Sequence, residues 1–457
     1  MATLRDGQQA GSGALCWAAR QERGTDRRHP EHLWLLGPPA AGGLGTNLRP
    51  RSDMVTTSQC LRERPRMRVT AVRKWVAEFG YYNAIYVRIE TDEGVVGESE
   101  VAMRRRTRTV AALIDELGEY LVGKDATRIE QHFERMYRDS FLGGTLLTIG
   151  ISALDIALWD LNARALGVPV HRMLGGKFRD RVPVYTHARA TETPELFAKE
   201  IADRLESGFT AIKTTLPGFY TKVSSVHHDT PAAIPARQTE TELLPNSIWP
   251  LIAEYFEAAR EVTGPDVHLM LDCHGRLNVA NSIRLAETLA PYRLTFIEEP
   301  TPPERPEWLV EVARRSSTPI AAGERWASHY GASPFLEQPA VSVAQPDVVF
   351  CGGITAAKRI ATLAETHGVS IAFHNPFGPL ASAATWQLAA TLPNFLISES
   401  MITPQQMVYW DRYTDGAPQV SGGEWLVTDE PGLGPRLRVD DILKHPFKPE
   451  YDRGGTR

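Results

Sequence analysis

The chain has 457 residues, of which 42% are hydrophobic and 23% charged, a composition typical of soluble globular proteins of two to three domains. No run approaches about 18 uninterrupted apolar residues, so we expect no membrane span. The formal net charge of -5, without a long basic tract, disfavours nucleic-acid binding. The four cysteines lack CxxC spacing, which argues against a zinc site or a disulfide framework and indicates a reducing, cytoplasmic location.

Residues 1–66 differ in composition from the rest of the chain. They contain ten arginines, no lysine and six acidic residues, and they show no sustained hydrophobic periodicity. Such a segment buries too little apolar surface to offset its chain entropy. We therefore expect a disordered extension, or sequence upstream of the true start, with the first domain beginning at Met67. A targeting peptide is disfavoured by the acidic residues and by the lack of an apolar core before a cleavage site.

The pattern over residues 67–181 predicts an α+β domain. Residues 67–101 alternate as strands do, and Thr91-Asp92-Glu93-Gly94 is typical of a hairpin turn. Residues 107–175 are helical in pattern, with an apolar stripe over 151–161 that Gly167 ends. We interpret this stripe as helix core and not as a cofactor site.

Residues 182–400 alternate between short apolar runs and helical segments. Eight runs in about 215 residues favour a closed barrel of parallel strands over an open sheet. No GxGxxG motif follows a strand, so a dinucleotide site is unsupported. Residues 401–457 lack this repetition. The eight predicted strands are 182–185, 211–213, 267–271, 294–297, 319–322, 348–350, 370–373 and 395–397.

Polar residues follow the predicted strands at regular intervals. In a parallel barrel the carboxyl ends of the strands meet at one rim, where active sites lie. Successive intervals of 26, 26, 23 and 27 residues from Asp272 to His374 each match one strand–helix unit. The candidates are Lys213, Asp272, His274, Glu298, Glu324, Asp347, His374 and Glu399.

Three of these candidates form a predicted metal site. Asp272, Glu298 and Glu324 place one carboxylate on each of three consecutive strands. Converging carboxylates repel strongly unless a cation neutralises them. Magnesium prefers carboxylate, water and substrate oxygens. The spacing therefore predicts a Mg²⁺ site at the barrel rim.

The two histidines are predicted to be catalytic. His274 lies two residues after Asp272, so strand alternation places both side chains on one face. Asp347 and His374 follow neighbouring strands, where a carboxylate can orient an imidazole as a general base. Glu299 should point away from the metal. Arg325 is interpreted either as a substrate contact or as an anchor for Glu324.

In combination, these motifs resemble the enolase superfamily, in its mandelate racemase subgroup, from Met67 to Pro446. The resemblance implies a modified (β/α)7β barrel over residues 182–400, an α+β capping domain over 67–181, and a segment 401–457 that completes the cap. It also implies magnesium at Asp272, Glu298 and Glu324. The motifs include 152–160 (SALDIALWD), 174–177 (LGGK), 272–276 (DCHGR), 297–300 (IEEP), 323–325 (GER), 345–347 (QPD), 352–354 (GGI) and 374–376 (HNP).

The resemblance implies removal of a proton α to a carboxylate. Many members carry Lys-x-Lys after the second barrel strand, but here the tripeptide is Lys213-Thr214-Thr215, and Thr215 cannot act as that base. His274 resembles instead the acid-sugar dehydratases, the galactonate type most closely. An aldonate would then lose its C2 proton to His374 and its 3-hydroxyl with help from His274, giving a 2-keto-3-deoxy acid.

The remaining predicted contacts belong to the same mechanism. Glu399 would hydrogen-bond the developing enediolate, Lys213 would support its charge, and Arg325 would contact the substrate. We expect a small-molecule substrate and a homo-oligomer.

Other functions stay open at this point. The interval from Lys213 to Asp272 holds an insertion near 216–248, either an inert surface segment or a lid over the catalytic mouth. Mannonate dehydratases carry an extended loop there, which makes mannonate dehydration the second hypothesis. A racemase or cycloisomerase could use the same enediolate chemistry, and a non-catalytic descendant is a further alternative.

Overall fold

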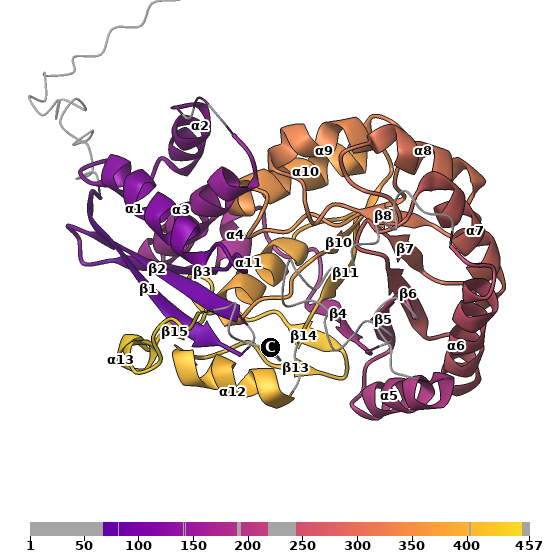
Figure 1. Cartoon of the computed structure of the whole chain (residues 1–457). Coiled ribbons are helices and arrows are strands. Elements are labelled where there is room, and N and C mark those ends of the chain that lie inside the picture. Colours follow the sequence, from indigo (N-terminus) through magenta and orange to yellow (C-terminus); the bar gives the residue numbers. More distant parts are fainter. Residues whose placement is uncertain are drawn as a thin grey trace, which may run out of the picture. The chain divides into compact units, whose positions relative to one another are not determined.

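The structure, a computed structural model, describes residues 67–80, 82–139, 141, 143–189, 193–217, 244–401 and 404–449 (Figure 1). The predicted extension at 1–66 lies outside the described residues. So does most of the predicted insertion, which the structure describes only at 216–217 and from 244 onward.

The first part of the described chain is an α+β unit, here called the cap. Its three strands form an antiparallel sheet in the order β1-β2-β3. Helices α1 and α3 pack on this sheet, and α3, the longest helix of the cap, also contacts the barrel helix α10 (Figure 1). The elements are β1 (Val69–Phe79), β2 (Tyr82–Thr91), β3 (Val96–Val101), α1 (Thr107–Leu121), α2 (Ile129–Asp139), α3 (Thr145–Ala165) and α4 (Val170–Met173).

Helix α3 is the central helix of the cap. By length and composition it could cross a membrane, but 89% of its apolar window is buried inside the structure. Apolar residues all around a helix indicate either a membrane span or a core helix, and here the burial identifies a core helix. After α3, Gly167 adopts the left-handed conformation that commonly ends helices, with φ 66°.

Eight parallel strands form the barrel that the sequence predicts. They pair in sequence order, and β11 pairs back to β4, which closes the sheet. A helix lies in each of the seven connections, so the architecture is a (β/α)7β barrel with a cap. The strands are β4 (Arg181–His187), β5 (Ala211–Thr215), β6 (His268–Asp272), β7 (Phe296–Glu298), β8 (Ile320–Ala322), β9 (Val343–Ala344), β10 (Ser370–Phe373) and β11 (Phe395–Glu399). The helices are α5 (Pro194–Glu206), α6 (Ile248–Thr263), α7 (Val279–Leu289) with the short η4 (Ala290–Tyr292), α8 (Pro306–Arg315), α9 (Ser328–Leu336), α10 (Gly353–Thr366) and α11 (Pro379–Ala389).

The sixth barrel strand is not where the sequence analysis placed it. The prediction of a strand over 348–350 was wrong, because β9 comprises Val343–Ala344 and residues 348–350 form a turn. The Asp347 carboxylate accepts hydrogen bonds from the amides of Val349 (2.7 Å) and Phe350 (3.1 Å). An aspartate that captures the amides just after it competes with strand pairing, so the β-branched valines do not form a strand.

The barrel interior is filled by one apolar layer. Every strand contributes a single inward residue, and together these side chains form a cluster separate from the main core. Layers of this kind make the barrel a packed core and not a pore. The eight residues are Tyr185, Ala211, Met270, Phe296, Ala321, Val343, Ala372 and Ile397.

The segment after residue 400 contacts both the cap and the barrel. Strand β14 pairs antiparallel with β4, so this segment extends the barrel sheet. It also reaches the cap, where Pro446 forms a bridge with Ala77 and the Leu437 amide donates to Glu98 Oε2 at 2.9 Å. Its elements are α12 (Pro404–Tyr413), β12 (Thr414–Asp415), β13 (Val420–Ser421), β14 (Glu424–Leu426), β15 (Arg436–Leu437) and α13 (Val439–Leu443).

Candidate active site

A layer of polar residues lies directly above the apolar layer of the barrel. Because side chains on a strand alternate with a period of two, the residue two positions after each inward apolar residue also faces inward. At β8 this position is Gly323, and the carboxylate comes from the next residue, Glu324. Counted from β4 to β11, the layer is His187, Lys213, Asp272, Glu298, Gly323, Gln345, His374 and Glu399.

Two members of this layer were missed by the sequence analysis, His187 and Gln345. His187 Nε2 lies 2.5 Å from Glu399 Oε1, and Gln345 Nε2 donates to Glu298 Oε2 at 2.8 Å. The signal that could have found them is the same period of two, counted from Tyr185 and Val343. For Gln345 that signal was hidden by the misplaced sixth strand.

The predicted metal ligands lie together. One oxygen from each of Asp272, Glu298 and Glu324 falls within 4.8 Å of the other two. Glu298 Oε2 has two donors, Lys213 at 2.7 Å and Gln345. Glu298 Oε1 is buried and has no hydrogen-bond partner among the described residues. A buried carboxylate oxygen is costly to leave unpaired, so this atom and its two neighbours fit a hard divalent cation.

The charges around these carboxylates shift their pKa values strongly. Burial, reinforced by Asp272, raises the pKa of Glu298 to about 7. Burial opposes the ionised form of Glu324 as well, yet His374 and Arg325 hold its pKa at about 2.

Lys213 is fully buried within the carboxylate cluster. Its Nζ lies 3.7 Å from Asp272 Oδ2 and 3.8 Å from Glu399 Oε1, besides the shorter contact with Glu298. Burial alone would lower the pKa of Lys213, but Glu298 and Glu399 raise it well above its ordinary value. The ammonium is therefore a fixed internal cation beside the triad.

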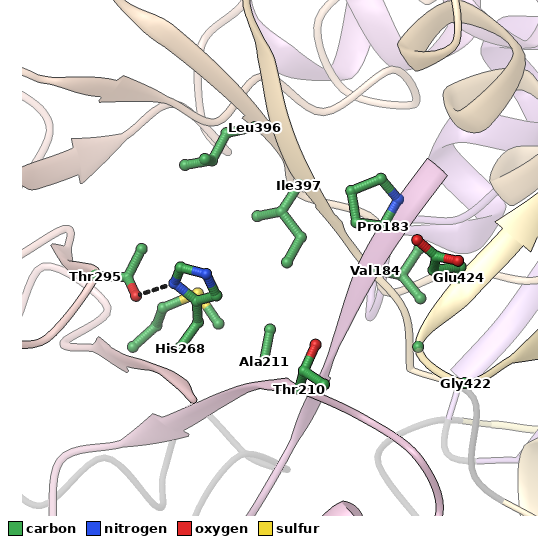
Figure 2. Close-up of a pocket in the computed structure, with 12 residues that line it drawn as sticks. Pro183, Val184, Thr210, Ala211, His268, Thr295, Leu396, Ile397, Gly422 and Glu424 are labelled. Carbon is green, nitrogen blue, oxygen red and sulfur yellow. Dashed lines mark hydrogen bonds between the residues drawn. The ribbon is translucent and has the colours of Figure 1, made fainter. Parts of the chain in front are cut away.

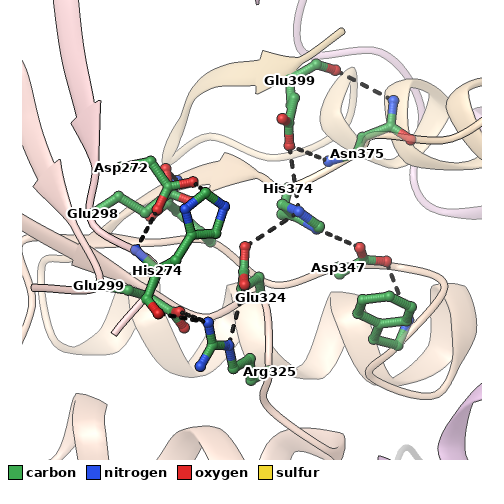
Figure 3. Close-up of polar contacts among 12 residues, drawn as sticks. Asp272, His274, Glu298, Glu299, Glu324, Arg325, Asp347, His374, Asn375 and Glu399 are labelled. Carbon is green, nitrogen blue, oxygen red and sulfur yellow. Dashed lines mark hydrogen bonds and ion pairs between the residues drawn. The ribbon is translucent and has the colours of Figure 1, made fainter. Parts of the chain in front are cut away.

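His274 contacts the first ligand of the triad, but not through strand alternation (Figure 3). Strand β6 ends at Asp272, and His274 adopts a left-handed backbone with φ 51°. The His274 amide donates to Asp272 Oδ1 at 2.9 Å, and its Nε2 lies 3.2 Å from Asp272 Oδ2. The expected proximity is present, whereas the predicted reason for it was wrong. Burial lowers the pKa of His274 to about 4.

Asp347 and His374 form the pair expected of a general-base dyad (Figure 3). His374 Nδ1 lies 2.5 Å from Asp347 Oδ2, and Nε2 lies 3.3 Å from Glu324 Oε2. Burial would lower the pKa of His374, but Glu399, Glu324 and Asp347 together raise it to about 10. Because Nδ1 donates to Asp347, Nε2 is the atom directed at the triad.

Glu399 is ionised and has partners at both oxygens. His187 contacts Oε1, and the Asn375 amide donates to Oε2 at 2.9 Å (Figure 3). Although burial opposes ionisation, Lys213 and His374 hold the pKa of Glu399 well below its ordinary range. In this state the carboxylate can only accept hydrogen bonds.

Arg325 links the triad to the segment that carries His274. Its Nε lies 3.2 Å from Glu324 Oε1, and Nη2 lies 3.1 Å both from Glu299 Oε2 and from the His274 carbonyl oxygen. The Glu299 side chain thus contacts Arg325 in Figure 3. Arg325 is also 39% exposed, so it can anchor Glu324 and still face a bound molecule.

A cavity of about 500 Å³ opens between the cap and this end of the barrel. Its size lies in the range of small-molecule sites. In its lining, residues of the cap lie next to Glu324, one of the candidate metal ligands. The lining residues are Tyr82, Ala102, Met103, Arg104, Thr145, Glu324, Arg325, Phe350, Pro376 and Phe377.

A second cavity, of about 370 Å³, lies at the opposite end of the barrel (Figure 2). Its walls include Ala211 and His268, which begin strands β5 and β6. His268 hydrogen-bonds Thr295 there, and Glu424 is the other titratable residue in the lining. Active sites of such barrels lie at the carboxyl ends of the strands, so the first cavity is the candidate active site.

Comparison with known families agrees with this geometry. Residues 63–175 match the mandelate racemase / muconate lactonizing enzyme N-terminal domain, and residues 196–442 match the enolase C-terminal domain-like family. The chain belongs to the enolase superfamily. Its cap and barrel correspond to the two domains of that superfamily, and the chain is one of the superfamily's enzymes.

Curated relatives of this enolase-superfamily chain are named as dehydratases of sugar acids. A D-galactonate dehydratase of Cronobacter sakazakii is 33% identical, over 79% of this chain and 90% of that protein. A D-mannonate dehydratase of Caulobacter vibrioides is 32% identical, over 81% of this chain and 93% of that protein.

Solved structures of the superfamily share its fold. A mandelate racemase/muconate lactonizing enzyme from Jannaschia sp. CCS1 has a TM-score of 0.74 at 28% identity, covering 84% of this chain and 98% of that one. An enolase-superfamily member from Salmonella Typhimurium has a TM-score of 0.75 at 28% identity, covering 83% and 98%.

Proposed function

We propose that the chain is a Mg²⁺-dependent acid-sugar dehydratase that converts an aldonate, galactonate-like in class, to a 2-keto-3-deoxy acid. The observation that carries this proposal is the placement of two histidines against different members of one carboxylate triad. His274 Nε2 lies 3.2 Å from Asp272, and His374 Nε2 lies 3.3 Å from Glu324. The dehydratase names of the relatives support the same reaction class.

Magnesium would be held by Asp272, Glu298 and Glu324, where it would supply positive charge to the oxygens of the substrate's carboxylate. The unpaired Glu298 Oε1 supports this assignment. On the protein side, Lys213 and Gln345 fix the other oxygen of Glu298, so that its carboxylate keeps one orientation.

His374 is assigned as the base that takes the C2 proton. Its Nδ1 donates to Asp347, so Nε2 is the nitrogen that can accept the proton once the imidazole is neutral. Carboxylates hold the pKa of His374 at about 10 in the metal-free protein, and Glu324 is one of them. With Glu324 engaged as a metal ligand, its charge would raise the pKa of His374 less, so the neutral imidazole would be favoured. A base positioned in this way contributes about 10² to 10⁴ in rate.

His274 is assigned as the acid that protonates the departing 3-hydroxyl. Burial lowers its pKa to about 4, so this role requires that the bound substrate raise the pKa of His274. Glu399, as an ionised carboxylate, would accept a hydrogen bond from a substrate hydroxyl. It could donate a hydrogen bond to an enediolate only after it is protonated. Lys213 would offset the negative charge that forms, and Arg325 would contact the substrate at the cavity wall.

D-Mannonate dehydration is the second candidate, favoured by the mannonate dehydratase relative at 32% identity. The test is to incubate the purified, Mg²⁺-loaded chain with a library of C5 and C6 aldonates and aldarates. We expect a 2-keto-3-deoxy product from an aldonate, detected by a keto-acid reagent. Deuterium in recovered substrate without loss of water would instead indicate a racemase, and absence of turnover across the library would contradict the proposal.

A further inference from the structure

The two loops that carry the Asp347–His374 dyad are anchored on the cap. Asp347 begins the segment that leads into α10, and His374 begins the segment that leads into α11. Each helix starts at a glycine, Gly352 or Gly378, and neither glycine offers a side chain to the first amides of its helix. Helix starts need acceptors for these amides, so the acceptors must come from elsewhere.

Two buried cap carboxylates provide these acceptors. Asp155 on α3 accepts from the Thr355 amide at 3.0 Å and from its hydroxyl at 2.6 Å. Glu100 on β3 accepts from the amides of Gly378 and Leu380, both at 3.1 Å. The members of each interaction lie 200 or more residues apart in the sequence.

The fit of these carboxylates leaves no room for a larger residue. A Cβ placed on Gly353 would lie 2.3 Å from Asp155 Oδ2, and one placed on Gly378 would lie 2.2 Å from Glu100 Oε1. A Cβ does not approach a non-bonded atom this closely, so a side chain at either position would force the carboxylate away. The glycines therefore allow the cap carboxylates to approach the helix starts directly.

A row of polar side chains on α3 extends the contact with the first loop. Thr148, Ser152, Asp155 and Trp159 are spaced four, three and four residues apart, which places them on one face of the helix. Ser152 Oγ accepts from the Gly352 amide at 3.0 Å, and Trp159 Nε1 donates to the Thr355 hydroxyl at 2.9 Å. These polar residues lie on the helix that the sequence analysis interpreted only as core.

Three consecutive hydrogen bonds connect this row to the base. The Thr148 hydroxyl donates to the Phe350 carbonyl oxygen at 2.6 Å. The Phe350 amide donates to Asp347 Oδ1 at 3.1 Å, and Asp347 Oδ2 lies 2.5 Å from His374 Nδ1. A shift of the cap at Thr148 would thus change the orientation of the Asp347 carboxylate.

We propose that Asp155, Glu100 and Thr148 are positioning residues for the proposed reaction, which hold Asp347 and His374 in their catalytic orientation. The inference rests on the proposed function for its kinetic consequence. Its structural part, control of the Asp347–His374 hydrogen bond by the cap, holds whatever the substrate is. A displacement of about 1 Å far from the chemistry can lower a rate about 10²-fold.

The test compares Asp155→Asn and Glu100→Gln with Asp160→Asn as a matched control. Asp160 is also a buried carboxylate on α3, but its partners are Arg164 and the amides of Glu98 and Leu433, away from the dyad. We expect kcat to fall about 10²-fold in the first two variants, with KM and Mg²⁺ affinity nearly unchanged. The control should lose stability but keep its kcat.

A measurement without substrate separates this inference from the proposed function. In ¹⁵N-histidine-labelled protein, the Nδ1 proton of His374 should give a downfield NMR signal because it is strongly hydrogen-bonded to Asp347. We expect Asp155→Asn and Glu100→Gln to shift or broaden this signal and Asp160→Asn to leave it in place. If all three variants behave alike in signal and kcat, the positioning role is wrong.

Thr148 supplies variants that change the side chain by a single group. Thr148→Val replaces the hydroxyl by a methyl group of similar size, and Thr148→Ser retains the hydroxyl but loses the methyl group. The inference predicts a changed His374 signal and a lower kcat for valine, with recovery for serine. Equal behaviour of the valine and serine variants would overturn it.

Discussion

The Lys213 ammonium lies 2.7 Å from Glu298 Oε2, and both side chains are buried in the polar layer of the barrel. Lys213 is the one lysine in that layer, where it faces Asp272, Glu298 and Glu399. Removing one partner of a buried ion pair leaves an uncompensated charge, which is more damaging than replacing both partners.

Lys213→Met should therefore destabilise the metal-free protein by about 3 kcal/mol, measured by urea denaturation in the presence of a chelator. The double variant Lys213→Met/Glu298→Gln should recover part of this loss, because the unpaired carboxylate is gone. Lys199 is exposed, so Lys199→Met serves as the control and should change the free energy of unfolding by less than about 0.5 kcal/mol. An unchanged urea midpoint for Lys213→Met would contradict the buried pair.

Glu298→Gln should abolish turnover and greatly weaken Mg²⁺ binding, measured by titration calorimetry. The fold should survive, because the ligand sits at the barrel rim and not in the apolar layer. The exposed Glu307→Gln is the matched control and should bind Mg²⁺ as the unaltered chain does. Full turnover after exhaustive chelation would rule out the metal site.

His374→Asn should stop exchange of the substrate's C2 hydrogen with solvent deuterium, because the base is absent. His274→Asn should lower elimination by about 10² to 10⁴ while exchange at C2 continues where the enediolate returns to substrate. Mass spectrometry of recovered substrate measures the exchange, and formation of the keto acid measures the elimination.

The roles of the two histidines separate more sharply with a 3-fluoro analogue of the substrate. Fluoride needs less proton assistance than hydroxide, so this analogue should rescue His274→Asn and not His374→Asn. Rescue of the His374 variant alone would reverse the assignment.

Glu100 and Asp155 should make stability depend on pH. Burial raises the pKa of each to about 7, from ordinary values of 4.5 and 3.8. A carboxyl whose pKa is raised on folding stabilises the fold below its ordinary pKa, and this contribution is lost as pH rises through about 7. Glu100→Gln and Asp155→Asn should each flatten the decline of the urea midpoint between pH 5 and pH 8, measured with chelator present. A decline as steep as in the unaltered chain would contradict the raised pKa values.

Deleting residues 1–66 should leave the melting temperature and turnover nearly unchanged, because their composition lacks the apolar residues for a packed core. Differential scanning calorimetry and the keto-acid assay check this expectation. A large loss of either quantity would show that the segment docks on the rest of the chain.

A regular repeat of apolar runs and polar residues was enough to predict the barrel and the three carboxylates of the triad. Asp272, Glu298 and Glu324 recur at intervals of 26 residues, and each interval is one strand–helix unit of the barrel. Because parallel strands deliver their carboxyl ends to one rim, this repeat was enough to predict that their oxygens converge, and they lie within 4.8 Å.

The surroundings of the triad depend on contacts between segments that lie far apart in the sequence, and these could not be predicted. Local periodicity reports that a face is buried but not what it is buried against. The apolar stripe of α3 gave no sign that Asp155 reaches Thr355, because a hydrogen bond across 200 residues leaves no local pattern. The sixth strand failed for a related reason: Val348 and Val349 favour a strand, yet the Asp347 carboxylate takes the following amides and forms a turn. Gln345 lies in the polar layer because the strand comprises Val343–Ala344, which puts Gln345 two positions after the inward Val343.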